Sequence, residues 1–360
     1  MATARHRAID VIRRRTTLER KQQEMGRDLE IGQELARDDF ERAEEEIADD
    51  LLRLMFIACH PVLPVEARVA LTLRLLGGLT TDEIARAFLV PEPTIAQRIV
   101  RAKRTLSEAR VPFEVPVGPD FAARLSSVLQ VIYLVFNEGY SATAGEDWLR
   151  PALMENALRL GRILAGLVPD EPEVHGLVAL MEIQASRTRA RVGRGGKPIP
   201  LLEQNRARWD WVLVGRGLAA LRRAERLAHE PGPYTLQAAI AAVHARARRP
   251  EDTDWGRILA LYDALAQIAP SPIVDLTRAV AVGMAYGPEA GLELVDALVG
   301  EPTLQTYHLL PAVRADLLAR LGRHDEASAE FLRAASLTLN APERELLRER
   351  ARSRPDGCRG

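Results

Sequence analysis

Apolar residues recur at helical spacing along most of the chain, and glycine and proline residues separate the apolar stretches. From residue 49 onward, the pattern predicts one helix through 51–57 and a second over 65–76, which ends at Gly77 and Gly78. No stretch shows the alternation of apolar and polar residues that is typical of a half-buried strand. These patterns predict an all-α fold.

A helix-turn-helix is predicted directly after these two helices. Thr80 and Glu83 have the spacing of a capping box, which favours the start of a short helix. After a tight turn at 90–93, a more basic helix is predicted over 94–109. Two short helices joined by a tight turn, the second of them basic, are typical of DNA-binding proteins. The apolar side chains expected to point inward from the first helix are Ile84, Ala85, Phe88 and Leu89.

The chain after the proline-rich segment 111–119 has the pattern of many helices joined by short loops. Such a series favours antiparallel helix pairs stacked into an α-solenoid-like domain. The stretch from Gly322 to Ala334 also has the small–aromatic–small spacing of a tetratricopeptide second helix, with Ala327 and Phe331 inside it. Helices are expected over 120–137, 147–167, 171–189, 201–229, 233–247, 253–268, 272–286, 288–299, 306–321, 324–339 and 341–352.

Charge is nearly balanced over the chain but unevenly distributed along it. The 360 residues include 49 basic and 50 acidic side chains, which excludes a uniformly basic coat for nucleic acid. Residues 1–27 carry eight basic and three acidic side chains, whereas 28–50 carry eleven acidic ones and two arginines. The acidic segment is interpreted as a solvated linker or exposed helix, or as a segment that shields a basic neighbour.

The sequence gives no sign of an enzyme, and we expect no catalytic residue, metal ion or cofactor. The seven histidines are scattered and form no metal-ligand pair. Residues 193–197 resemble a phosphate loop, but Arg191 replaces its first glycine and Pro198 its Ser or Thr. Cys59 and Cys358 do not suggest a secreted disulfide framework. Apolar stretches are too short and interrupted to span a membrane, and no signal peptide is apparent, so a cytoplasmic location is expected.

The helix predicted over 94–109 has one apolar and one polar face. The polar face suits a DNA major groove, because arginine can pair with guanine and glutamine with adenine. Arg98 and Lys103 lie at its flanks, which favours phosphate contacts. An ordinary basic surface helix is the alternative. The apolar stripe, which is expected to pack on the preceding helices, consists of Ile95, Ile99, Ala102 and Leu106. The candidate DNA-binding residues are Thr94, Gln97, Arg98, Val100, Arg101, Lys103 and Arg104.

Two parts of the chain resemble one known family. Residues 50–103 resemble region 4 of sigma-70-family factors, and more narrowly the extracytoplasmic-function class, through Leu79-Thr80-Thr81-Asp82-Glu83-Ile84-Ala85 and Val90-Pro91-Glu92-Pro93-Thr94-Ile95. The chain after Pro119 resembles the tetratricopeptide-like helical extension of one subgroup of these factors. The runs that carry this second resemblance include Asn137-Glu138-Gly139-Tyr140, Arg208-Trp209-Asp210 and Asp252-Thr253-Asp254-Trp255.

The resemblance implies a promoter-recognition subunit of bacterial RNA polymerase. Region 4 would then read the −35 promoter element and touch the polymerase core, and the helical extension would regulate it, with a regulatory protein as a further partner. By position, the groove-facing residues would be Ala96, Gln97, Val100 and Arg101. Residues 1–20 resemble the last helix of sigma region 2, so most of that region is expected to be missing.

The predicted organisation therefore has six parts. They are a region 2 remnant at 1–20, an acidic linker at 21–48, region 4 at 49–110, a proline-rich hinge at 111–119, a tetratricopeptide-like domain at 120–352 and a tail at 353–360. The alternative function is a truncated sigma-like protein that acts as an interaction scaffold through its helical domain. Upstream sequence that encodes a region 2 would favour the sigma factor, and a stop codon there would favour the scaffold.

Overall fold

The structure is a computed structural model and describes residues 48–353. Contacts within the chain define two compact units, Met1–Arg53 and Leu54–Gly360. The described part of the first unit, 48–53, is helical. The helices named below all belong to the second unit. The segments predicted at 1–20 and 21–48 lie outside the described residues apart from Ala48, and so does the tail beyond Ser353.

The predicted helix-turn-helix is present. Its two helices are α3 (Thr81–Ala87) and α4 (Glu92–Glu108), and both pack on the preceding α2 (Val65–Leu75). Because the three helices pack together, α2 is counted with the helix-turn-helix below. The capping box forms as predicted, because Thr80 Oγ1 accepts a hydrogen bond from the Glu83 amide at 3.2 Å and the Thr80 amide donates to Glu83 Oε2 at 2.8 Å. The helix α4 begins two residues earlier than predicted, since Pro93 is tolerated in the first helical turn.

One residue of the predicted inward face does not point inward. Ile84 and Ala85 are buried and Phe88 is half-buried, but Leu89 is 55% exposed. Leu89 lies in the turn after α3 with φ of 52°, in the left-handed region that a branched side chain rarely adopts. The expectation failed because the helix ends at Ala87, so helical periodicity no longer applies to Leu89.

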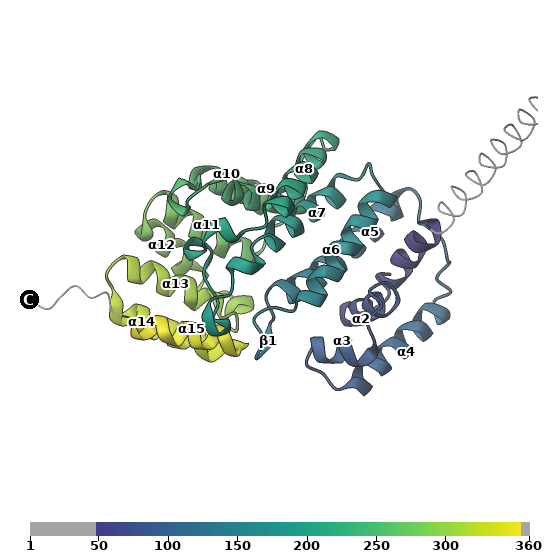
Figure 1. Cartoon of the computed structure of the whole chain (residues 1–360), viewed down its shortest axis with the longest axis horizontal. Helices are drawn as coiled ribbons and strands as arrows, with labels where there is room; N and C mark the ends of the chain where they lie inside the picture. Colours follow the sequence, from purple (N-terminus) through teal and green to yellow (C-terminus); the bar gives the residue numbers. More distant parts are fainter. Residues whose placement is uncertain (1–47, 354–360) are drawn as a thin grey trace, which may run out of the picture. The chain divides into compact units, whose positions relative to one another are not determined.

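The rest of the second unit is a series of helices, in which each packs on its neighbours in the chain (Figure 1). This arrangement confirms the all-α prediction with a helix-turn-helix followed by an α-solenoid-like domain. The helices are α5 (Pro119–Tyr140), α6 (Pro151–Leu167), α7 (Pro172–Ala185), α8 (Trp211–Leu227), α9 (Pro233–Arg246), α10 (Trp255–Ile268), α11 (Pro272–Ala285), α12 (Pro288–Leu298), α13 (Leu309–Arg320), α14 (His324–Leu337) and α15 (Ala341–Arg352).

A long helix predicted over 201–229 is replaced by two short turns and the shorter α8. The turns are the 3₁₀ segments Leu201–Glu203 and Arg206–Arg208. The side chain of Asp210 then caps α8, because its carboxylate accepts hydrogen bonds from the amides of Val212 and Leu213 at 3.0 and 3.1 Å. The prediction was wrong because the apolar Trp209 fitted the helical pattern, whereas its backbone is extended and its side chain is buried.

Two very short strands join distant parts of the helical series. Strand β1 (Ala144–Gly145) follows α5, and β2 (Leu339–Asn340) lies between α14 and α15. They pair in parallel, with Ala144 opposite Leu339 and Gly145 opposite Asn340. Strands of two residues are too short to produce an alternating pattern, which explains why the sequence did not indicate them.

Candidate nucleic-acid interface

The helix α4 is held by its apolar stripe. Ile95, Ile99 and Ala102 are buried and Leu106 is half-buried, as the sequence predicted. Because these residues recur every three or four positions, they fix which face of α4 meets the other helices. The opposite face is therefore left to solvent.

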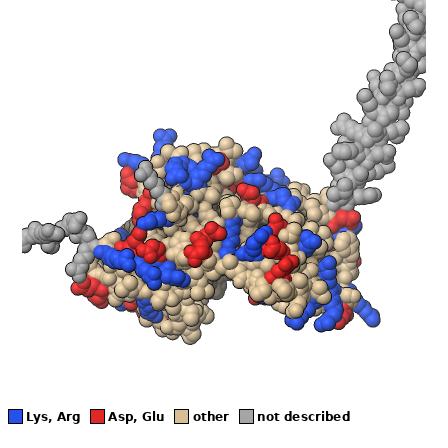
Figure 2. All heavy atoms as spheres, turned by 60° about the horizontal axis from the view of Figure 1, so that its bottom comes forward, with Lys and Arg blue, Asp and Glu red and all other residues tan. Residues whose placement is uncertain are grey.

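That solvent face carries most of the candidate DNA-binding residues. The exposed members are Gln97, Val100, Arg101, Lys103 and Arg104, and Val100 is 66% exposed. An apolar side chain that is so exposed suits contact with a thymine methyl group. Figure 2 shows basic side chains projecting from the surface that α3 and α4 form.

The basic residues of this face differ in how free they are. Arg104 pairs with Glu108 at 3.4 Å, and both side chains are exposed. Arg101 and Lys103 make no hydrogen bond or ion pair with any residue in the described part of the chain. A guanidinium without a protein partner can bind a base without first breaking an ion pair. Arg101 is therefore the arginine of this face best suited to a base contact.

Two of the predicted residues lie apart from the others. Thr94 and Arg98 are half-buried. Arg98 lines a cavity of about 200 Å³ together with Leu134 and Glu138 of α5. The side chain of Arg98 therefore faces the helical extension from the edge of the polar face of α4.

The helix-turn-helix contacts the helical extension through polar groups that the sequence analysis missed. From α2, the buried Arg68 donates to Ser127 of α5, and Ser127 donates to the carbonyl of Cys59. From the extension, Arg159 of α6 donates to the carbonyl of Leu76, and Arg150 donates to that of Ala87. No sequence signal identifies these residues, because one arginine among many on a helix surface does not reveal a distant carbonyl partner.

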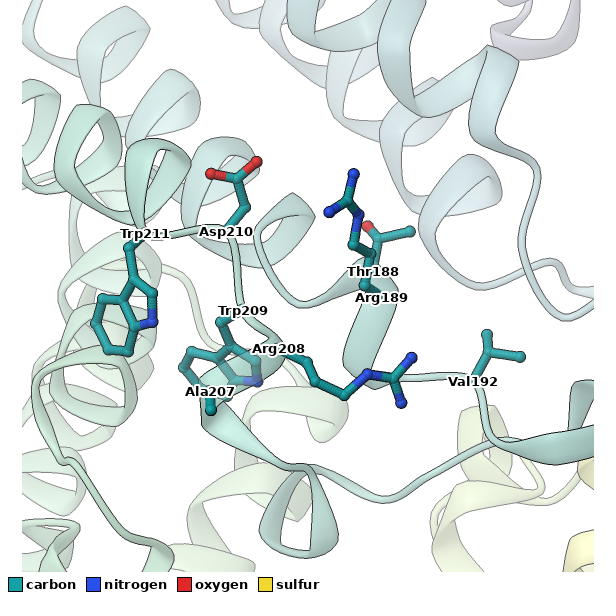
Figure 3. Close-up of a pocket in the computed structure, with 8 residues that line it drawn as sticks. All are labelled: Thr188, Arg189, Val192, Ala207, Arg208, Trp209, Asp210 and Trp211. Carbon is teal, nitrogen blue, oxygen red and sulfur yellow. The ribbon is translucent and has the colours of Figure 1, made fainter.

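A second candidate surface lies in the helical extension, where a hollow of about 760 Å³ is present. Figure 3 shows Arg189 and Arg208 extending from the two segments that border it, with the indole of Trp211 on the other side. Both arginines are exposed, and they make no ion pair with the described residues. Trp211 is 50% exposed. Two free guanidinium groups beside an aromatic ring suit an acidic partner.

Comparison with known proteins places these features in families. Residues 53–106 match the family described as Sigma-70, region 4, and residues 124–225 match a family of unknown function (DUF6596). The chain is also similar to Uncharacterized protein R00370 of Rhizobium meliloti (strain 1021), with 48% identity over 300 residues, which are 83% of this chain and 70% of that protein. The chain belongs to the family of that protein. Its sigma-70 region 4 supports a sigma-70-family protein with a general role in binding promoter DNA and RNA polymerase. No solved structure matches the chain.

The described part of the chain was also searched for a membrane-spanning helix and for a metal site. By length and composition alone, α5 could cross a membrane, contrary to the expectation that every apolar stretch is too short, and no other helix within 48–353 could. A core helix passes the same test, and Val135 and Phe136 of α5 are fully buried in the protein. Within the same residues, no group of three His, Cys, Asp or Glu side chains is arranged to hold a metal ion.

Proposed function

We propose that the chain is a cytoplasmic sigma factor of the extracytoplasmic-function class, which recognises a −35 promoter element for RNA polymerase. The observation that carries the proposal is the polar face of α4, which leaves Gln97, Val100 and Arg101 exposed on a region 4 helix-turn-helix. Arginine and glutamine supply the hydrogen-bond patterns that read bases in the major groove.

Selection of duplexes from a random-sequence pool by the purified chain tests the proposal. We expect one short motif to be enriched, and core RNA polymerase to bind the chain. A matched control is Arg226→Ala on α8, an exposed arginine far from α4 in the sequence, which should enrich the same motif. Uniform binding to all sequences would contradict the proposal, because phosphate contacts alone are not sequence-specific.

The helical extension is proposed to be a tetratricopeptide-like regulatory domain that binds a protein. The buried Ala327 and Ala334 of α14 support the first part, since small residues allow two helices to approach closely. Double replacement of Arg189 and Arg208 by glutamate should change transcription from a target promoter in cells, with duplex affinity of the purified protein unchanged. Unchanged transcription would argue against this surface.

An interaction scaffold without promoter recognition is the second candidate function. The hollow beside Arg189, Arg208 and Trp211 favours it, because that surface is independent of α4. The two functions differ in the selection experiment, since a scaffold enriches no DNA motif.

A further inference from the structure

The turn between α3 and α4 is held in an unusual backbone conformation. Leu89 has φ of 52°, which a non-glycine residue rarely adopts, and local backbone hydrogen bonds from the Leu89 and Val90 amides close the turn. This turn sets the angle between α3 and α4, and therefore the direction in which the polar face of α4 points. The groups that hold the turn therefore help to set the orientation of α4 toward DNA.

One such group is Arg150, which belongs to the helical extension. Its guanidinium donates to the carbonyl of Ala87, the last residue of α3, and pairs with Glu138 of α5. It also donates to the carbonyl of Ala144 at 2.8 Å. The Arg150 and Glu138 side chains are 12% and 10% exposed, so the pair is mostly shielded from water. Arg150 therefore ties the end of α3 to two parts of the extension.

A second contact reaches the turn from strand β1. A Cβ atom on Gly145 would lie 3.0 Å from Leu89 Cδ1, a distance shorter than an ordinary van der Waals contact. Gly145 also has φ of 101°, which a larger residue rarely adopts. The backbone conformation favours glycine at 145, and the short distance shows that the β1 loop lies directly against Leu89.

The loop is in turn fixed from the other end of the helical series. Asn340 of β2 has no exposed surface, and its side-chain amide donates to the carbonyls of Ala142 and Asp147 at 3.0 and 2.9 Å. Together with the β1–β2 pairing, these bonds hold the backbone on both sides of Gly145. The contacts therefore connect the last helix pair, the β1 loop and the turn of the helix-turn-helix. In Figure 1, β1 lies between α15 and α3.

We propose that Arg150 is a positioning residue for DNA recognition: it acts through the carbonyl of Ala87 to hold the turn, and so the orientation of α4. The inference rests on the proposed function of α4. It makes sequence-specific binding dependent on the helical extension. The physical reason is that a bidentate base contact requires an accurate orientation. Without Arg150 the turn keeps only its local backbone hydrogen bonds, so α4 is expected to vary more in its orientation.

The test compares the full chain with Arg150→Ala and with a matched control, Arg159→Ala. Both arginines belong to the same stretch of the extension and donate to carbonyls of the helix-turn-helix, but Arg159 reaches Leu76 at the end of α2. The probe is the duplex motif that the unmodified chain enriches. We expect about tenfold weaker binding for Arg150→Ala, less than twofold for Arg159→Ala and partial recovery for Arg150→Lys.

Hydrogen exchange gives a reading that does not depend on DNA. Amides of residues 86–90 should exchange at least about fivefold faster in Arg150→Ala than in Arg159→Ala, at a temperature where both proteins are folded. Removing Arg150 leaves Glu138 without its charged partner, with only Thr143 still donating to its carboxylate, which destabilises the protein. If Arg150→Ala does not fold, the double variant Glu138→Gln with Arg150→Gln replaces it, because it leaves no unpaired charge.

The outcomes separate the inference from the proposed function. A chain that enriches no duplex would contradict the proposed function. A chain that enriches a duplex to which Arg150→Ala and Arg159→Ala bind equally well would contradict this inference alone. Equal exchange rates at residues 86–90 in the two variants would also overturn it, with or without DNA binding.

Discussion

The guanidinium carbon of Arg350 lies 4.7 Å from the centroid of the Phe331 ring. Phe331 is on α14 and Arg350 on α15, and Phe331 is only 3% exposed. The same arginine pairs with Asp316 of α13. Three consecutive helices therefore meet around one aromatic ring, which makes Phe331 the structural centre of the last helix group.

Phe331→Ala is expected to destabilise this group strongly. Removal of a buried phenylalanine costs about 3–5 kcal/mol in free energy of unfolding, because apolar contacts are lost and a cavity remains. The neighbouring Leu332 is 53% exposed, so Leu332→Ala is the matched control and should cost much less. Chemical denaturation followed by circular dichroism measures both. Equal losses would show that Phe331 is not a core residue.

Cys59 is expected to be unreactive in the folded protein. Burial raises the pKa of its thiol to about 11, and its Sγ atom lies 3.3 Å from Thr72 Oγ1. The thiolate, which is the reactive form, is therefore scarce at neutral pH. In a Cys358→Ser variant, labelling by a thiol reagent at pH 8 should be slow and should become fast in denaturant. Fast labelling without denaturant would contradict the burial of Cys59.

Stability should fall as the pH drops below neutral, in part because of His244. Burial, together with the positive charges of the nearby Arg187 and Arg206, lowers the pKa of His244 to about 3. The unfolded chain has an ordinary histidine pKa of about 6.5, so it binds a proton that the folded protein rejects between about pH 6.5 and pH 3. The contribution of neutral His244 is thus complete above pH 6.5 and is lost progressively below it.

The variant His244→Gln isolates this effect, because glutamine does not titrate in this range. The free energy of unfolding of the unmodified chain should decrease more steeply from pH 6.5 to pH 4.5, by up to about 1.4 kcal/mol per pH unit, than that of the variant. Urea denaturation at several pH values measures both slopes. Parallel slopes would show that His244 titrates normally in the fold.

The sequence predicted those features correctly that depend on residues only a few positions apart. The capping box at Thr80 and Glu83 and the stripe of Ile95, Ile99 and Ala102 are set by neighbours a few residues away, and both are present. The same reasoning failed for Leu89, because α3 ends at Ala87 and the chain turns there, with amides of the turn bonded to carbonyls of the last helical turn. It also failed at Trp209, which is buried by residues far away in the chain although its backbone is extended.

The contacts between the helix-turn-helix and the extension could not be predicted from the sequence for a related reason. Arg150 and Ala87 are 63 residues apart, and Asn340 lies 198 residues from Ala142. Side-chain to backbone contacts at such separations leave no periodic pattern, because a carbonyl is present at every residue. Only the assembled fold brings these partners together.

The central claim is that α4 reads DNA sequence, and Arg101 tests it most directly. Binding of the full chain is measured to the duplex motif that it enriches and to a scrambled duplex of the same composition, with Arg101→Ala and Lys103→Ala compared. Arg101→Ala should cost about 1–3 kcal/mol on the enriched duplex and little on the scrambled one, because a base contact is specific. Lys103→Ala should weaken both duplexes similarly. Equal losses on the two duplexes for Arg101→Ala would contradict base reading by α4.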